Sequence, residues 1–355
     1  MVKEKSEYRT YVMVFGTTVS LFLTALLAAA FYIQPLEGEL TRLGSYAERD
    51  FGWNLPQKKV REDARLITNY QDYSDVLIVG DSFSTNGIWQ PFFRQYTGLS
   101  YVTLDIRKTS LPDLLASKPF RAYPPKIVIL QSVERELLFF FKDLNFGCND
   151  KKQQDVYIPL KGIAEQPEIG YYVETRKTFD LRNINLKYAA SVVVNTVIRG
   201  ISSGDSKNTN KFYLINNTLF SNKRSGELLI YEGDMQKSAW RNEDLARAAC
   251  SIRGLQSRVQ SNGKTFFIFM LAPDKSTAYA EFTVTPEFRN IFQSAEVLED
   301  YGVNVPRLDL ILKAAIHSGE KDIYIPSSTH WSARGYALAA EGISEFIKKR
   351  SVSSP

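Results

Sequence analysis

Two residue types that commonly build catalytic and metal sites are scarce in this chain of 355 residues, which has only two cysteines and two histidines. The cysteines, Cys148 and Cys250, do not form a CxxC pair, which argues against a zinc site. The sequence also lacks a phosphate-binding P-loop and a dinucleotide fingerprint, so we expect no metal, nucleotide or redox cofactor. A mechanism that needs a histidine base has two candidates, His317 and His330.

The chain carries no long tract of one charge sign. Its net charge is +5, and the lysines and arginines are scattered along the sequence. This pattern gives no support for a nucleic-acid partner. The contents of 44% hydrophobic and 23% charged residues are ordinary for a globular protein, so we expect a folded domain rather than a disordered chain.

Only one hydrophobic run is long enough to cross a membrane. Residues 11–33 contain no charged side chain and would form about 34 Å of helix, against a hydrocarbon core of about 30 Å. Lys3, Lys5 and Arg9 precede this run, and the positive-inside rule then places the N-terminus in the cytoplasm. We therefore predict a cytoplasmic tail over 1–10, a single-pass anchor in the cytoplasmic membrane, and an extracytoplasmic remainder, periplasmic in a Gram-negative host.

A cleaved signal peptide is the alternative reading of the same run, because the three alanines at 28–30 are small enough for a signal peptidase. The run is longer than the usual signal-peptide core of about 7–15 residues, which favours an uncleaved anchor. In an oxidising compartment Cys148 and Cys250 could form a disulfide, and two buried thiols are the alternative.

Short apolar runs alternate with segments of helical spacing in the rest of the chain. This alternation predicts an α/β fold with a mainly parallel sheet covered by helices on both faces. The predicted strands cover residues 75–80, 101–106, 126–132, 265–271 and 322–326, and the predicted helices cover 111–116, 242–260 and about 332–349.

Three further boundaries follow from composition. Residues 34–72 are mixed and charged and are predicted to form a stalk between the membrane and the domain. The domain itself is predicted over 73–350. Within it, residues 141–240 are rich in Asn, Lys and Tyr and interrupt the alternation, which indicates an inserted subdomain.

The strongest local motif follows the first predicted strand of the domain and reads Gly80-Asp81-Ser82-Phe83-Ser84. Functional groups in open α/β sheets lie at the carboxyl ends of strands. A serine at the start of the next helix is exposed beside backbone N–H groups that can stabilise an oxyanion. Ser82 is therefore a candidate nucleophile, and Asp81 is predicted to bond the backbone of the turn. The alternative is a strand followed by an ordinary Asp/Ser helix cap.

A second motif, Ser328-Thr-His-Trp-Ser332, lies between a predicted strand and the last predicted helix. A histidine in such a loop can act as general base to a serine, which makes His330 the partner of Ser82. The alternative is a helix-cap loop with an exposed histidine. His317 lies at the end of a predicted helix, and we expect it to be structural.

The two motifs together resemble those of SGNH hydrolases, and especially the SGNH-like proteins of alginate O-acetylation (AlgX/AlgJ). Two more stretches fit this resemblance, IVILQSVER at 127–135 and FMLAPDKSTAY at 269–279. The resemblance implies a flavodoxin-like three-layer fold and a Ser-His-Asp site for acyl transfer. In that site Ser82 would take the acyl group and His330 would activate it.

The sequence departs from the family at two parts of the site. The aspartate expected two residues before the histidine is Ser328 here, so the candidate third members are Asp322, Asp309 and Ser328. The glycine and asparagine blocks of ordinary SGNH esterases are also missing. The candidates for oxyanion or substrate contacts are Gln131, Ser132, Arg135 and Trp331.

Two of these side chains have a second reading. Trp331 would either stack on a sugar ring or pack in the core. Arg135 would either hold an anion or pair with a neighbouring acid.

The resemblance implies an O-acyltransferase, with acetyl as the expected acyl group, that acts on a cell-surface or secreted polysaccharide. Its expected partner is a multi-spanning membrane O-acyltransferase that supplies the acyl group. One alternative is a carbohydrate esterase with the same nucleophile and water as the acceptor. The other is a catalytically weak scaffold in a polysaccharide export or modification complex, which the missing aspartate would favour.

Overall fold

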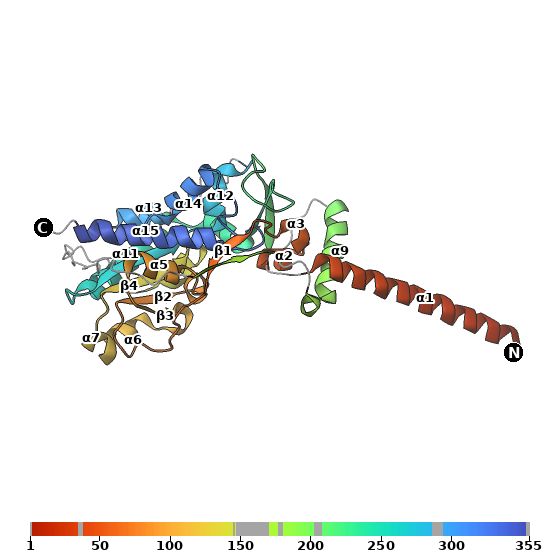
Figure 1. Cartoon of the computed structure of the whole chain (residues 1–355), viewed down its shortest axis with the longest axis horizontal. Coiled ribbons are helices and arrows are strands. Elements are labelled where there is room, and N and C mark those ends of the chain that lie inside the picture. The colour runs from red at the N-terminus through yellow and green to blue at the C-terminus, as the bar shows by residue number, and fades with distance from the viewer. Residues whose placement is uncertain are drawn as a thin grey trace.

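The structure is a computed structural model that describes residues 2–34, 38–144, 146, 170–176, 180–201, 208–285 and 294–352. Its centre is a four-stranded sheet in the order β3-β2-β4-β8, in which every pair of neighbours is parallel (Figure 1). The strands are β2 (Val76–Gly80), β3 (Tyr101–Asp105), β4 (Ile127–Val133) and β8 (Phe266–Ala272). The four strands predicted over the same stretches are thus confirmed.

Helices cover both faces of this sheet because its strands are apolar on both sides. Ile78, Ile129 and Ile268 lie in register across one face. They belong to a core that α5, α14 and α15 complete. Their sequence neighbours point to the other face, into a core completed by α7, α8 and α11. The main covering helices are α5 (Trp89–Thr97), α7 (Lys118–Ala122), α8 (Leu137–Phe141), α11 (Asn242–Gln260), α14 (Leu308–His317) and α15 (Ala333–Val352).

Several shorter elements connect these layers. The short α-helices are α4 (Ser82–Thr85), α6 (Leu111–Ala116), α10 (Glu232–Met235), α12 (Lys275–Tyr279) and α13 (Ser294–Asp300). The 3-10 turns are η1 (Ile106–Lys108), η2 (Glu134–Glu136), η3 (Leu181–Asn183), η4 (Gln236–Ala239) and η5 (Ala280–Phe282). The arrangement is the mixed α/β fold with a parallel sheet that the sequence predicts.

The prediction of a strand over 322–326 is wrong. The structure has only an isolated antiparallel bridge there, between Tyr324 and Trp331. Asp322 has a φ of 53°, in the left-handed region, which breaks an extended conformation at the start of the segment. Pro326 has no N–H to donate to a ladder. The segment is therefore a buried turn that leads into the loop of His330.

The N-terminal run forms a single helix, α1 (Val2–Ile33), which projects from the rest of the molecule (Figure 1). Residues Ser6–Ile33 are long and apolar enough to cross a membrane, and none of the most apolar stretch is buried in the protein. A helix of this kind can serve as a membrane anchor or as a signal sequence. Its end packs on α9 (Leu186–Ile201), through Ala30 and Ile33.

The segment predicted to be a stalk is folded onto the domain over its described residues 38–72. Leu40, Phe51 and Trp53 are buried, which gives the segment an apolar anchorage that a free linker would lack. It also pairs with described parts of the predicted insertion. The elements concerned are α2 (Glu39–Gly44), α3 (Glu48–Phe51), β1 (Gln57–Val60), its antiparallel partner β5 (Tyr171–Glu174), and the hairpin of β6 (Thr209–Tyr213) and β7 (Glu227–Tyr231).

Candidate active site

Ser82 is the first residue of α4 and directly follows the turn at the carboxyl end of β2. Asp81 holds this turn as predicted, because one carboxylate oxygen accepts from the N–H of Phe83 at 2.9 Å and the other from the N–H of Val133 at 2.6 Å. The turn needs glycine at position 80, where a Cβ atom would lie 2.5 Å from the side-chain oxygen of Gln131. The sequence thus fixes Ser82 at the edge of the sheet between β2 and β4.

His330 meets Ser82 across this edge. Its Nε2 lies 3.0 Å from the Oγ of Ser82, within hydrogen-bond distance. The imidazole also stacks on Phe83, with ring centroids 4.8 Å apart. The structure therefore brings together the two residues that the motifs single out, although they are 248 positions apart in the chain.

The other ring nitrogen of His330 faces an acid that the sequence analysis missed. Its Nδ1 lies 3.1 Å from Oε1 of Glu39, the first residue of α2. The same oxygen accepts from the N–H of Thr329 at 2.9 Å and from its hydroxyl at 2.6 Å, while Oε2 accepts from the hydroxyl of Ser328 at 2.8 Å. Glu39, His330 and Ser82 form a continuous chain of hydrogen bonds.

This environment keeps Glu39 ionised. Burial raises the pKa of the carboxyl, but the hydrogen bonds and charge of His330, together with the two bonds from Thr329, outweigh it and hold the pKa far below its usual range. A carboxylate that accepts from Nδ1–H leaves Nε2 of His330 without a proton and directed at Ser82. The geometry is that of a nucleophile, a general base and a group that orients the base.

The two aspartates proposed for this role lie elsewhere. The carboxylate of Asp322 accepts from the backbone N–H of Ser221 at 2.8 Å and from its hydroxyl. Asp309, in the first turn of α14, forms an ion pair at 2.9 Å with Arg307, which precedes the helix. Ser328 does lie in the site, 3.5 Å from Nδ1 of His330, but its hydroxyl donates to Glu39 and so supports the acid rather than replacing it.

The loop that carries His330 is held by three groups around it. Glu48 accepts from the hydroxyl of Ser327 at 2.7 Å, and the N–H of Leu40 donates to the carbonyl of Ser327 at 3.0 Å. In addition, the buried Nζ of Lys275 donates to the carbonyl oxygen of Pro326 at 2.6 Å and to those of Ile325 at 3.1 Å and Ser328 at 3.2 Å. The N-terminal segment and α12 together fix the position of the imidazole.

Lys275→Met should loosen this loop and lower the free energy of unfolding by about 1–3 kcal/mol, because buried carbonyls lose their donor. Burial also lowers the pKa of Lys275 to about 7. The folded protein then binds this proton more weakly than the unfolded chain, so the wild-type free energy of unfolding should rise by on the order of 1 kcal/mol per pH unit from pH about 7 up to the ordinary lysine value of 10.5. Chemical unfolding of the detergent-solubilised protein at several pH values measures both effects. The exposed Lys264→Met should change neither, and an identical pH profile in Lys275→Met and wild type would refute the assignment.

Neither of the two polar candidates on β4 offers a free donor to Ser82. Gln131 uses both ends of its amide on Asp81, at 2.9 Å and 3.0 Å. The hydroxyl of Ser132 donates to the carbonyl of Val133 at 3.0 Å. These residues stabilise the turn instead, so their predicted oxyanion role is not supported. In the described part of the chain, the backbone N–H of Ser82, at the start of α4, makes no hydrogen bond and is a remaining candidate donor to an oxyanion.

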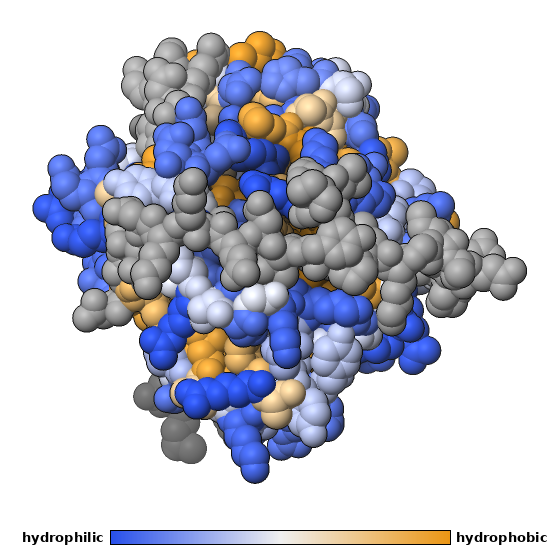
Figure 2. Space-filling model, turned by 90° about the vertical axis from the view of Figure 1, so that its left-hand side faces the viewer, coloured by the Kyte–Doolittle hydropathy of each residue, from blue (hydrophilic) through white to orange (hydrophobic). Residues whose placement is uncertain are grey.

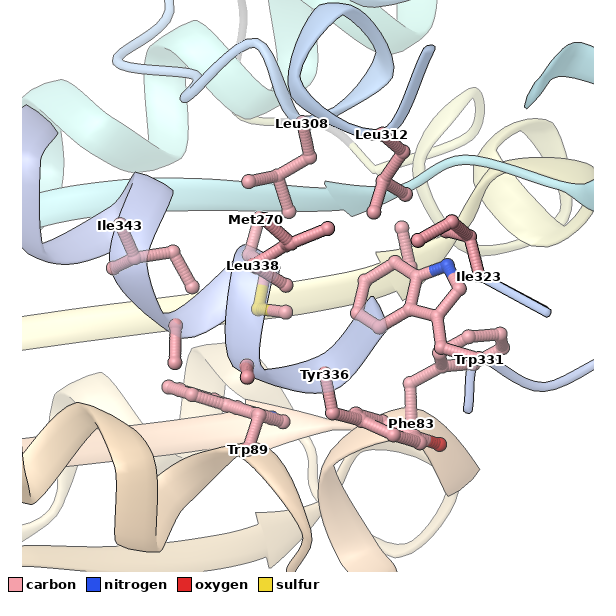
Figure 3. Packing of buried hydrophobic residues seen from close by; sticks show 14 of the residues in the cluster. Phe83, Trp89, Met270, Leu308, Leu312, Ile323, Trp331, Tyr336, Leu338 and Ile343 are labelled. Atoms are coloured by element: carbon pink, nitrogen blue, oxygen red, sulfur yellow. The ribbon is translucent and has the colours of Figure 1, made fainter. Parts of the chain in front are cut away.

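Trp331 packs in the core and does not stack on a sugar. It is 1% exposed, and its ring lies 4.8 Å from that of Phe83. Figure 3 shows the indole enclosed by Phe83, Leu312 and Ile323. Of the two readings of Trp331, burial is correct. The residue therefore anchors one side of His330 through the hydrophobic core.

Arg135 belongs to a buried ionic cluster. Its Nη1 lies 2.6 Å from Asp274 and 3.4 Å from Asp234. Lys237 bridges the same Asp274, at 2.8 Å, to Glu134, at 2.7 Å. Burial opposes ionisation of Asp274, but the two cations lower its pKa, whereas burial and the neighbouring acid raise the pKa of Asp234. The cluster joins the end of β4 to α12, so Arg135 is paired rather than free to hold an anion.

Asp274→Asn should destabilise the protein by about 3–5 kcal/mol, because it leaves two buried cations short of their shared anion. Thermal or chemical unfolding in detergent measures the loss. The matched control is Asp244→Asn, which breaks an ion pair with the exposed Arg241 and should change little. Equal stability of both variants would mean that the cluster adds nothing to the fold.

His317 and Cys250 take no part in this site. His317 is the last residue of α14, with an exposed side chain 3.4 Å from Glu281. Cys250 is disulfide-bonded, and Cys148 lies outside the described residues. Over the part of the chain that the structure describes, no group of three or more His, Cys, Asp or Glu side chains could hold a metal ion.

The comparisons with known proteins gave one match, which covers the C-terminal part of the chain. Residues 228–354 match the family model of the SGNH hydrolase-like domain of acetyltransferase AlgX. This segment is SGNH hydrolase-like. The match confirms the predicted resemblance, and it includes His330 and Lys275 but not Ser82 or Glu39. Searches of curated proteins and of solved structures gave no match. The AlgX-like segment thus contains His330, and the chain before it contains Ser82 and Glu39.

Proposed function

We propose that this protein is a membrane-anchored, extracytoplasmic O-acyltransferase that carries an acyl group, in the first instance acetyl, on Ser82. The observation that carries the proposal is the hydrogen-bonded chain from Glu39 through His330 to Ser82. A serine hydroxyl is a weak nucleophile unless a base accepts its proton, and here an oriented imidazole is in place to do so. The AlgX-like segment adds an independent reason to expect acetyl chemistry.

The reaction would proceed in two balanced steps. His330 takes the proton of Ser82 while Oγ bonds to the carbonyl carbon of the acyl donor, and the same proton then passes to the leaving group. In the second step His330 takes the proton of an acceptor hydroxyl, that oxygen attacks the acyl-Ser82 ester, and the proton returns to Ser82. Glu39 stabilises the imidazolium that forms in each step.

The site lies close to the end of α1, which suits an acyl donor at the membrane. Glu39 follows Ile33 by six positions, a length of chain that spans at most about 22 Å. We propose that a multi-spanning membrane O-acyltransferase supplies the acyl group across the bilayer. The acceptor would be a hydroxyl of a cell-surface or secreted polysaccharide.

The alternatives from the sequence differ in their support. A weak or inactive scaffold was favoured by the lack of an aspartate before His330, and Glu39 supplies the missing carboxylate by another route. A carbohydrate esterase would use the same residues with water as the acceptor. Transfer and hydrolysis diverge only in what reaches the acyl-enzyme.

The test is intact-mass spectrometry of the full chain in detergent after brief exposure to p-nitrophenyl acetate. We expect one acetyl adduct, mapped by peptide analysis to Ser82. Acetyl groups found on added oligosaccharides would support transfer, whereas release as acetate alone in their presence would favour the esterase. Absence of any adduct at every pH between about 6 and about 9, a range that begins below and ends above the ordinary histidine value of about 6.5, would leave the scaffold.

A further inference from the structure

The helix α9 lies across the end of α1. Figure 1 shows α9 roughly perpendicular to α1, at the point where α1 meets the domain. The contact joins Ala30 and Ile33 of α1 to Tyr188, Ala189 and Val192 of α9. If α1 crosses a bilayer along its normal, α9 is parallel to the membrane surface.

The apolar stripe of α9 points away from the protein, the reverse of an ordinary surface helix. Along this stripe the spacing of four, three, four and four residues places the side chains on one face of the helix. The residues of this outer face are Leu186, Ala190, Val193, Val197 and Ile201. Val193 is 45% exposed, Val197 58% and Ile201 85%, so nothing in the described protein covers the face.

Two polar side chains of α9, those of Ser191 and Arg199, turn inward instead. Arg199 donates to the carbonyl oxygens of Gly44 at 3.0 Å and Ser45 at 2.8 Å. The hydroxyls of Ser191 and Ser45 lie 2.7 Å apart. These contacts fix the rotation of α9 about its axis, and so they fix the direction in which the outer face points.

The position of α9 along α1 corresponds to the expected position of a membrane surface. A hydrocarbon core of about 30 Å takes about 20 helical residues, and counting from Tyr11 this length ends near Ala30, where α9 packs. Phe31 and Tyr32 follow, with exposed aromatic side chains of the kind found at membrane interfaces. By contrast, the end of the domain remote from α1 is largely hydrophilic over its described residues (Figure 2).

We propose that the outer face of α9 lies in the boundary between lipid headgroups and acyl chains, as an interfacial helix. This inference rests on the membrane anchor of the proposed function. Lipid rather than a protein is the occupant because the outer face is continuous with the exposed apolar surface of α1. In addition, the exposed cation Lys187 lies beside the outer face on α9, where it suits an anionic headgroup. Because α1 and α9 would then both contact the membrane, at right angles to each other, they would hold the domain with the Glu39 side of its site toward the bilayer.

Photo-crosslinking of the full chain tests this placement. Benzoylphenylalanine would replace Val197 on the outer face, Phe22 on α1 as the membrane control, and Leu310 on α14 as an exposed control away from α1. Phe22 is 66% exposed and Leu310 52%, so each probe starts from an accessible position. Each protein is reconstituted into vesicles of phosphatidylethanolamine and phosphatidylglycerol, irradiated, and analysed by mass spectrometry for lipid adducts.

We expect lipid adducts at 22 and 197 in similar yield and none at 310. An adduct at 22 without one at 197 would overturn the interfacial helix and leave the anchor intact. A crosslink from 197 to a second copy of the chain would assign the face to self-association and equally overturn the proposal. No lipid adduct at 22 would refute the anchor and the inference with it.

Discussion

Glu39→Gln should slow acylation of Ser82 by roughly 10³- to 10⁴-fold, the scale that the comparable Asp-to-Asn change has in a serine protease. The amide keeps the shape of the side chain but loses the charge that stabilises the imidazolium. Its NH₂ group can also donate to Nδ1, which would put the imidazole proton on Nε2 and disable the base. The release of p-nitrophenol in the first turnover measures the acylation rate directly.

The controls for this prediction are the two aspartates that the sequence alone offered as partners. Asp322→Asn and Asp309→Asn alter carboxylates that face Ser221 and Arg307, not His330. Both variants should acylate within a few-fold of wild type where they stay folded. A normal rate in Glu39→Gln, or an equally large loss in a folded Asp322→Asn variant, would remove Glu39 from the mechanism.

His330→Ala should reduce acylation by roughly 10⁴- to 10⁶-fold, because no other base among the residues that the structure describes lies within hydrogen-bond distance of Ser82. Ser82→Ala should give no adduct at all. The adduct is counted by intact mass over long incubation, so that slow residual acylation is visible. His317→Ala is the matched control, since that histidine is exposed beside Glu281 and should leave the rate unchanged. Persistence of a fast adduct at Ser82 in His330→Ala would show that another group acts as base.

The sheet and half of the site could be predicted because their signals are local. A run such as Val76–Gly80 is apolar on every position, which in this setting means a strand covered on both faces. Ser82 and His330 each lie in a short motif beside a predicted element. The strand predicted over residues 322–326 was wrong because a short apolar run does not reveal a residue with a left-handed backbone conformation within it.

Glu39 could not be found in this way because nothing near it in the chain marks it. It lies 291 positions before its partner, in a segment whose composition suggests a linker. Its role depends on Leu40 and neighbouring residues packing beside the loop of His330, which is a tertiary event. The roles of Gln131 and Trp331 could not be predicted either. Hydrogen bonds to Asp81 orient the side chain of Gln131, and packing in the core orients that of Trp331.

The distribution of the site along the chain has a consequence for protein synthesis. Glu39 and Ser82 precede His330 by 291 and 248 positions, so both leave the ribosome well before His330 is available. In a nascent or stalled chain that lacks His330, Ser82 therefore has no imidazole beside it. The proposed acyl-enzyme chemistry becomes possible only once His330 has been synthesised and the chain has folded around it, so shorter fragments should form no adduct at Ser82.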